Sequence, residues 1–321
     1  TPELLLSSAF PYGEKADGSR VHFFPRPILP PGDRGTPAEK PSESSDLDAI
    51  KQRKKLKKVE FLPQDIFEAL LQGQGENAAA NLGKKLMAML NDKEKEQALA
   101  TPKVKAESVT HNRIDRLRGG TLSVDGKGQL FHVEEQFITL PEEESQAYQD
   151  GGLFFLVRGP LAERDAANPG QPSVLEVLLR FLSHIGIGGD RSTGKGHFEL
   201  ELKPCDFLSP PEAAEAWINL SLYSPTPEEA AAYDAATDKD EDHLRYALED
   251  RQGQVGNQGY KRVTKAPLTM FKEGSLFPFW DRQKTYGQIV KVVDHTRTEG
   301  LIAHDVWQYG YAFPVPIHFP S

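Results

Sequence analysis

The chain has 321 residues, enough for two hydrophobic cores of ordinary size, and its 38% hydrophobic and 26% charged residues are typical of a globular protein. A single cysteine, Cys205, excludes an internal disulfide and favours a reducing compartment, so we expect a cytoplasmic protein. No apolar run approaches the roughly 18 residues that cross a bilayer, and we expect no membrane association.

The first part of the chain combines a polar insertion with short elements. Residues 30–45 are rich in proline, glycine, serine and charge, which is typical of a disordered linker or loop. The basic run 51–58 overlaps a predicted strand over 54–62. Hydrophobic spacing then predicts helices over 64–71 and 82–99, for which packing is the expected role.

The middle of the chain is predicted to contain strands. Residues 121–137 form a β-hairpin that turns at Asp125 and Gly126. Three apolar residues are expected on one face of its second strand: Phe131, Val133 and Phe137. A continuous apolar run predicts a buried strand over 152–158.

A helix, a glycine-rich loop and a strand are predicted next. A serine suited to capping precedes the helix over 173–184, and residues 197–203 alternate as a half-buried strand does. Between them, residues 186–196 (the glycine-rich loop) combine five glycines with Arg191 and Lys195. Because glycine lets backbone N–H groups approach a ligand and form anion-binding nests, we predict that this loop holds phosphate.

A nucleotide-binding P-loop is the first alternative for this segment. Gly189, Gly194 and Lys195 match most of that motif, but Gly196 stands where Ser or Thr would bind Mg²⁺. A P-loop also runs from strand to helix, and the predicted order here is the reverse. An ATPase is therefore disfavoured.

Prolines between residues 204 and 211 mark a predicted domain boundary, and a strand over 217–223 opens the second unit. A threonine–proline pair predicts the start of a helix over 227–233. Further strands are expected near Tyr246 and over three ranges: 263–270, 288–293 and 306–313.

Four aromatic residues alternate near the C-terminus: Trp307, Tyr309, Tyr311 and Phe313. One strand would place all four on one face. Such a row can stack nucleobases, but we favour a role in the core or in a protein interface.

A strand–helix–strand order after a hairpin is the second half of a ferredoxin-like unit, and the second unit is again β-first with a helix inserted. We therefore predict an α+β protein of two ferredoxin-like domains, residues 1–206 and 207–321. The glycine-rich loop lies in the first domain, and both domains carry insertions.

The glycine-rich loop resembles the signature loop of the CRISPR RAMP proteins, which bind RNA on ferredoxin-like domains. Further stretches sharpen this resemblance: Leu6 to Tyr12, Arg113 to Arg116 with Gly119 and Gly120, Met270 to Ser275, and Tyr309 to Pro314. In this order they resemble subunit four of the Csm complex, the type III-A CRISPR effector.

The resemblance implies a non-catalytic, cofactor-free RNA-binding subunit that serves antiviral defence. Its RNA ligand would be the 5′ handle of the CRISPR RNA (crRNA), and target RNA would be met only through the assembled complex. Its protein partners would be the large polymerase-like subunit and the backbone RAMP subunit, which it joins. Chains of this type usually open with a strand and a helix before the segment matching residues 7–12, so we expect that part to be absent here.

The predicted RNA site has two groups of residues. In the loop, backbone N–H groups and the Arg191 and Lys195 side chains are expected to contact phosphates, with hydroxyls added for phosphate or ribose. Asp190 would be repelled by phosphate, so we expect it to cap the loop or orient Arg191. The loop residues of the site are Gly186, Gly188, Gly189, Arg191, Ser192, Thr193, Gly194, Lys195 and Gly196.

The second group comprises His111, Arg113, Arg116 and Arg118, which are expected to contact phosphates or stack on splayed bases. A structural ion pair between Asp115 and an arginine explains this segment equally well.

The net charge of −9 argues against RNA binding, because nucleic-acid binders are more often basic. Screening limits charges to a reach of about 8–10 Å, so the local distribution matters more. Positive charge is concentrated in 51–58, 113–118 and 261–265, and acid in 142–144 and 228–250. This suits one RNA face, and solvated surface charge without a target is the alternative.

Metal binding has little support, because the nine histidines are scattered and the chain has one cysteine. The enzymatic alternative is a metal-independent endoribonuclease of the RAMP superfamily that processes CRISPR RNA with general acid–base histidines. Its candidates are His111, His184 and His197, although His184 is expected to be a capping or core residue.

Overall fold

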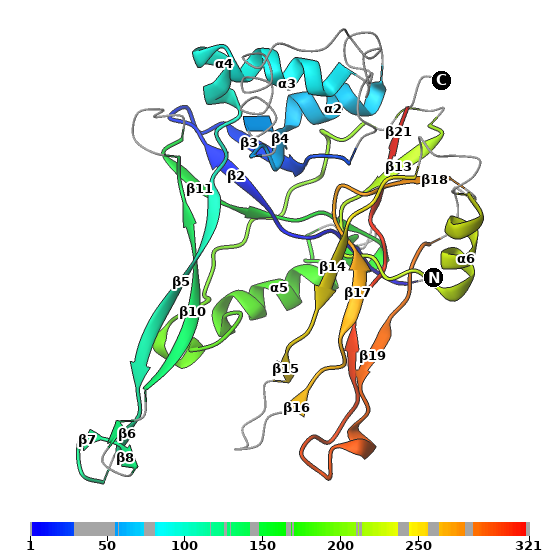
Figure 1. Ribbon diagram of the computed structural model, residues 1–321. Helices are drawn as coiled ribbons and strands as arrows, with labels where there is room; N and C mark the ends of the chain where they lie inside the picture. Colours follow the sequence, from blue (N-terminus) through cyan, green and yellow to red (C-terminus); the bar gives the residue numbers. More distant parts are fainter. Residues whose placement is uncertain are drawn as a thin grey trace, which may run out of the picture.

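The computed structural model describes residues 2–28, 55–56, 58–73, 81–115, 117–124, 127–128, 130–141, 148–164, 168, 170–209, 211, 214–236, 244–255, 263–279 and 285–318 (Figure 1). It shows an α+β protein, as predicted, built from antiparallel sheets with helices on their faces and ends. Within these residues, no helix has the length and apolar character needed to cross a membrane.

The N-terminal half is built on a four-stranded antiparallel sheet with the order β11-β2-β3-β4. Its strands are β2 (Phe10–Glu14), β3 (Arg20–Pro25), β4 (Phe61–Pro63) and β11 (Asp150–Phe154). Helix α2 (Gln64–Gln72) follows β4 directly and buries its apolar face, with the ring of Phe67 stacked on Phe24 at 4.6 Å. Helices α3 (Leu82–Leu90) and α4 (Lys93–Ala98) complete this layer (Figure 1).

Two N-terminal predictions need correction. The strand predicted over 54–62 exists only as β4, whereas Lys55 and Leu56 are helical. The helix predicted over 82–99 is divided at Asn91 and Asp92, residue types whose side chains compete with helical backbone hydrogen bonds. The predicted linker 30–45 and most of the basic run 51–58 lie outside the described residues.

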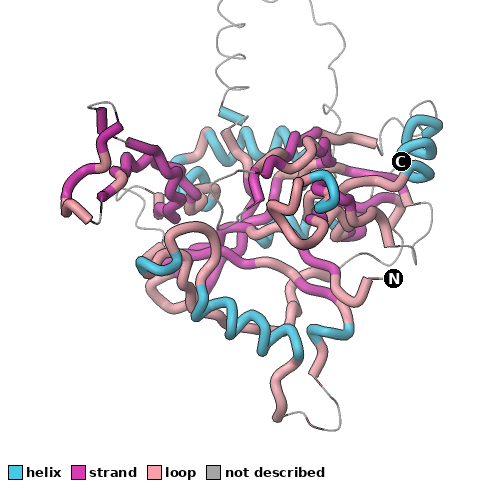
Figure 2. The backbone as a smooth tube through the Cα atoms, turned by 90° about the horizontal axis from the view of Figure 1, so that it is seen from below, coloured by secondary structure: helices cyan, strands magenta, loops and turns pink. Residues whose placement is uncertain are grey.

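A long two-stranded ribbon, β5 (Lys103–Asn112) and β10 (Leu130–Thr139), projects from the body of the molecule (Figures 1 and 2). Its register runs from Leu130 opposite Asn112 to Thr139 opposite Lys103. Short pairs form its tip: β6 (Ile114–Asp115) with β7 (Gly120–Thr121), and β8 (Ser123–Val124) with β9 (Lys127–Gly128). The hairpin predicted over 121–137 is therefore only partly right, because β8 and β9 flank the predicted turn but β10 pairs with β5, which the sequence analysis missed.

The buried strand predicted over 152–158 is also wrong in part. β11 ends at Phe154, and β12 (Val157–Arg158) pairs instead with β1 (Leu5–Leu6). Leu153 is 45% exposed, whereas Leu156 between the two strands is buried. The apolar run is thus divided between two sheets, and only part of it lies in the core.

Helix α5 (Val174–Ile185) forms as predicted, after the short 3₁₀ turn η3 (Pro160–Ala162). The Ser173 hydroxyl accepts a hydrogen bond from the Glu176 N–H at 3.2 Å and so caps the helix. The glycine-rich loop leaves the C-terminal end of α5.

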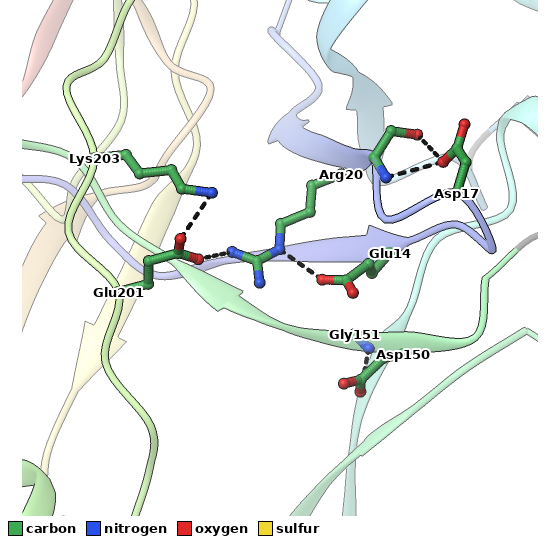
Figure 3. A network of polar contacts seen from close by, with 8 residues as sticks. Glu14, Asp17, Arg20, Asp150, Gly151, Glu201 and Lys203 are labelled. Atoms are coloured by element: carbon green, nitrogen blue, oxygen red, sulfur yellow. Dashed lines mark hydrogen bonds and ion pairs between the residues drawn. The ribbon is translucent and has the colours of Figure 1, made fainter.

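The strand predicted over 197–203 does not form, because this segment is extended but pairs with no strand among the described residues. Side chains hold it instead, as Figure 3 shows. Arg20 on β3 donates to Glu14 at 2.8 Å and also binds Glu201, whose other oxygen lies 2.8 Å from Lys203 Nζ. These carboxylates raise the pKa of Arg20 further above its ordinary value.

The C-terminal half is centred on β13 (Ala216–Asn219), a fully buried strand between β18 (Leu276–Pro278) and β21 (Pro314–Ile317). Helix α6 (Pro227–Ala236) forms as predicted. Two-stranded arms complete this half: β14 (Leu248–Arg251) with β17 (Leu268–Phe271), β15 (Gln254–Val255) with β16 (Val263–Thr264), and β19 (Val290–Val293) with β20 (Val306–Gln308).

The aromatic row near the C-terminus does not share one strand face, because β20 ends at Gln308. Trp307 is 54% exposed and Phe313 is buried. The Tyr309 hydroxyl accepts a hydrogen bond from the Leu6 N–H at 3.0 Å, so this part of the row joins the two ends of the described chain.

One hydrophobic core includes residues from both halves. Leu70 and Leu71 of α2 belong to the same buried cluster as Ile218 of β13 and Val315 of β21. The backbone of His318 donates to the Leu71 carbonyl at 2.8 Å, which fixes β21 against α2. The two ferredoxin-like domains and their division at residue 206 remain predictions.

Candidate nucleic-acid interface

The glycine-rich loop is closed at its neck by a hydrogen bond from the Ile187 N–H to the Gly196 carbonyl at 2.9 Å. Gly196 has a φ of 73°, and a Cβ added there would lie 1.9 Å from the Ile187 carbonyl oxygen. Glycine is therefore required at this position by both the backbone conformation and the close approach. Gly188 and Gly194 also have positive φ values, but open space surrounds them.

Inside the loop, a 3₁₀ turn, η4 (Arg191–Thr193), uses two of the amides that we predicted to face phosphate. The Thr193 N–H donates to the Asp190 carbonyl at 3.0 Å, and the Gly194 N–H donates to the Arg191 carbonyl at 3.1 Å. Gly188 and Gly189 make no backbone hydrogen bond within the described part of the chain. Their N–H groups are available to an external anion.

The loop borders an open hollow of about 570 Å³. Its lining residues are His184, Ile185, Gly188, Gly189, Asp190, Arg191, Ser192 and His197. Arg191 is exposed and makes no ion pair within the described residues, so its guanidinium is free to bind an anion here.

Lys195 is not free, because its Nζ donates to the carboxylate of Glu135 on β10. This contact holds the pKa of Glu135 below its ordinary value. The same carboxylate lies 3.7 Å from Nε2 of His111 on β5. Glu135 thus ties the glycine-rich loop to the ribbon, and a phosphate that binds Lys195 has to compete with it.

Asp190 does not have the role that we predicted. Its side chain makes no capping hydrogen bond to the turn that follows. Its carboxylate instead lies near the ribbon, where potential ligand atoms of His111, Glu135 and Asp190 are all within 4.8 Å of one another. The sequence could not predict that these three side chains lie close together, because they come from separate segments of the chain.

The structure divides the second predicted group. His111 lies beside the loop, whereas Arg113 and Arg118 lie beyond the end of β5, at the ribbon tip. Arg118 is 90% exposed, with Nε 3.9 Å from Asp115 Oδ2, which fits the structural ion pair weighed above but is weak at this exposure. Arg116 lies outside the described residues.

The three histidines considered for catalysis surround the same loop. His184 and His197 both line the hollow, and His111 approaches Asp190, which also lines it. His184 is exposed on the last turn of α5, so the prediction of a core residue is wrong, whereas its position at the helix end is compatible with the capping alternative.

Two clusters of described residues have the donor atoms for a metal ion. They are His111 with Glu135 and Asp190, and Asp294 with His295 and Asp305. In each cluster a lysine already binds a carboxylate: Lys195 binds Glu135, and Lys291 lies 2.6 Å from Asp305. Since a lysine already binds one of the two carboxylates in each cluster, we assign no metal to either.

The neck geometry predicts different effects for two glycine variants. Gly196→Ala should lower stability by about 1–3 kcal/mol, because it strains the backbone and opens the neck. Gly189→Ala adds a methyl group to open space and should change stability by less than about 0.5 kcal/mol. Chemical denaturation of both variants checks this, and equal midpoints would contradict the neck geometry.

Comparison with known proteins supports a CRISPR assignment. Residues 212–317 match the family model described as the CRISPR Csm4 C-terminal domain. No curated protein sequence matches the chain.

Solved structures give only weak similarity. One match is a chain of the type III-B Cmr-beta complex bound to cognate target RNA and AMPPnP, with 13% identity over 86% of this chain and a TM-score of 0.37. Another, from that complex bound to cognate target RNA, has 12% identity over 85% of this chain and a TM-score of 0.34. This chain spans 66% and 65% of those two chains, and scores this low carry no argument.

The matched domain is that of a type III CRISPR effector subunit. Residues 212–317 are similar to the C-terminal domain of the Csm4 family, which confirms the resemblance found in the sequence for this part of the chain.

Proposed function

We propose that this chain is the crRNA-binding subunit of a type III-A Csm complex. It binds and caps the 5′ handle of the crRNA and joins the large polymerase-like subunit to the backbone RAMP subunit. It has no catalytic role of its own, acts in the cytoplasm in antiviral defence, and is built from two ferredoxin-like domains.

The open hollow beside the glycine-rich loop is the observation that best supports RNA binding. The N–H groups of Gly188 and Gly189, which make no backbone hydrogen bond to a described residue, border it. The guanidinium of Arg191, which makes no ion pair among the described residues, adds a mobile positive charge. Backbone nests and arginine forks are the groups that bind phosphate oxygens. The order of elements around the loop differs from that of a P-loop, in which a strand precedes the loop and a helix follows it. Here α5 precedes the loop and an extended segment follows it.

RNA cleavage is the second candidate function, and the convergence of histidines favours it. One histidine as general base and another as general acid can cleave RNA through its 2′-hydroxyl without a metal. His184 and His197 line the hollow in which a phosphate is proposed to bind.

Incubation with 5′-labelled CRISPR repeat RNA, with and without Mg²⁺, separates the two functions on native and denaturing gels. We expect a shifted but intact RNA. Cleavage without Mg²⁺ that is lost in His184→Ala or His197→Ala would establish the ribonuclease instead. An RNA that is neither shifted nor cut would contradict both functions for the isolated chain.

A further inference from the structure

An exposed aromatic ring lies on the ribbon close to the glycine-rich loop. Phe131 on β10 is 45% exposed. Its ring lies 5.4 Å from the ring of His111, with an angle of 21° between the ring planes. The two residues are directly opposite in the register of β5 and β10, so the strands hold the pair in place.

This ring pair is on the ribbon face that contacts the loop. Side chains alternate along a strand, so Phe131 and Glu135 point to the same face of β10. Glu135 binds Lys195 of the loop and lies 3.7 Å from His111 Nε2. His111 therefore contacts the Phe131 ring and lies among the side chains that connect ribbon and loop.

The exposure of this pair needs a physical explanation. A two-stranded ribbon is marginally stable in water, and the cross-strand pair with His111 stabilises it only modestly while part of the Phe131 ring stays exposed. Aromatic rings beside a phosphate-binding surface are typical of sites for single-stranded nucleic acid, in which the bases stack while cations hold the backbone. The ribbon and the loop combine these two features.

We propose that Phe131, supported by His111, is a stacking platform for one unpaired RNA base whose backbone phosphate lies in the glycine-rich loop. This inference rests on the RNA-binding function proposed above and adds the part of the nucleotide that the ribbon recognises. Phe131 offers a ring face without hydrogen-bonding groups, so the platform accepts any base. Paired RNA keeps its bases stacked inside the helix, so the platform requires a single strand.

A matched pair of variants on the ribbon tests the platform. Phe131→Leu keeps an apolar side chain but removes the aromatic ring. Phe137→Leu is the control, because Phe137 lies on the same strand and face and is 44% exposed, but it lies opposite Lys105 and makes no ring contact with a described residue. Titration of the 321-residue chain with labelled single-stranded repeat RNA should show an RNA affinity about tenfold lower for Phe131→Leu than for the unaltered chain. The affinity of Phe137→Leu and of Phe131→Trp should be unchanged, because both variants keep an aromatic ring at position 131.

Abasic substitution along the RNA identifies the stacked nucleotide. RNA that lacks the base at one position should bind the unaltered chain about tenfold more weakly. The same RNA should bind Phe131→Leu no more weakly than intact RNA does, because removing the base and removing the ring abolish the same contact. RNA binding that depends on Arg191 but is equal in Phe131→Leu and Phe137→Leu would overturn the platform and leave the proposed function intact. No binding by the unaltered chain would overturn both.

Discussion

Replacing both Arg191 and Lys195 with alanine is expected to weaken RNA binding on the order of 100-fold, because two charge-assisted contacts to phosphate are lost. The slope of log affinity against log salt concentration should also fall by about one for each lost contact. Lys195 must first leave Glu135, whereas Arg191 makes no ion pair within the described residues. Arg191→Ala alone should therefore carry the larger share of the loss. Anisotropy titrations with labelled repeat RNA at several salt concentrations measure both quantities.

The matched control is Arg251→Ala with Lys272→Ala. Both residues are exposed cations whose nearest ion-pair partner is Glu249, away from the loop. The control lowers the net charge by the same amount, so it removes any general effect of charge on RNA binding. Equal affinities for the two double variants would mean that the glycine-rich loop is not the anchor.

Glu229→Ala is expected to lower the free energy of unfolding by about 3–5 kcal/mol. Glu229 is 1% exposed, and its carboxylate accepts hydrogen bonds from the Tyr223 hydroxyl and the Thr226 N–H at 2.9 Å and from the Gly287 N–H at 3.1 Å. Alanine leaves these three donors buried without this acceptor. Burial also raises the pKa of Tyr223, so its hydroxyl keeps its proton and stays a donor. Denaturation in urea, followed by tryptophan fluorescence, measures the change.

Glu228→Ala is the control for this prediction. Glu228 is the preceding residue of α6 and is exposed, so its removal should cost only a few tenths of a kcal/mol from the favourable field at the helix N-terminus. The Thr226 hydroxyl accepts from the Glu229 N–H at 3.2 Å, so Thr226 and Glu229 form a reciprocal capping box that Glu228 does not share. If both variants unfolded at the same urea concentration, the buried network would contribute nothing.

Helices with a strong local signal could be predicted from the sequence. Ser173 and the apolar spacing that follows it gave α5, and the Thr226–Pro227 pair gave α6. These predictions succeeded because capping and helical periodicity are local properties. The glycine-rich loop was found for the same reason, since its residues are contiguous in the chain.

Features that depend on distant pairing could not be predicted. Strand β5 alternates charged and small residues on an exposed ribbon, so it carries no hydrophobic face that would indicate a strand. The segment 197–203 has strand periodicity, but it pairs with no described strand, and Arg20 holds it through Glu201 instead. The Glu135–Lys195 contact joins residues sixty positions apart, and neither residue alone predicts the other.

The core shared by α2, β13 and β21 also determines what happens when the two halves of the chain are separated. Leu71, Ile218 and Ile317 are all fully buried in one cluster, so neither half can keep its apolar surface covered without the other. A break in the chain between the halves would leave two fragments held together by this surface. The stretch that matches the Csm4 C-terminal domain therefore shares its apolar core with residues that precede it, and loss of either half would expose apolar surface that favours proteolysis and aggregation.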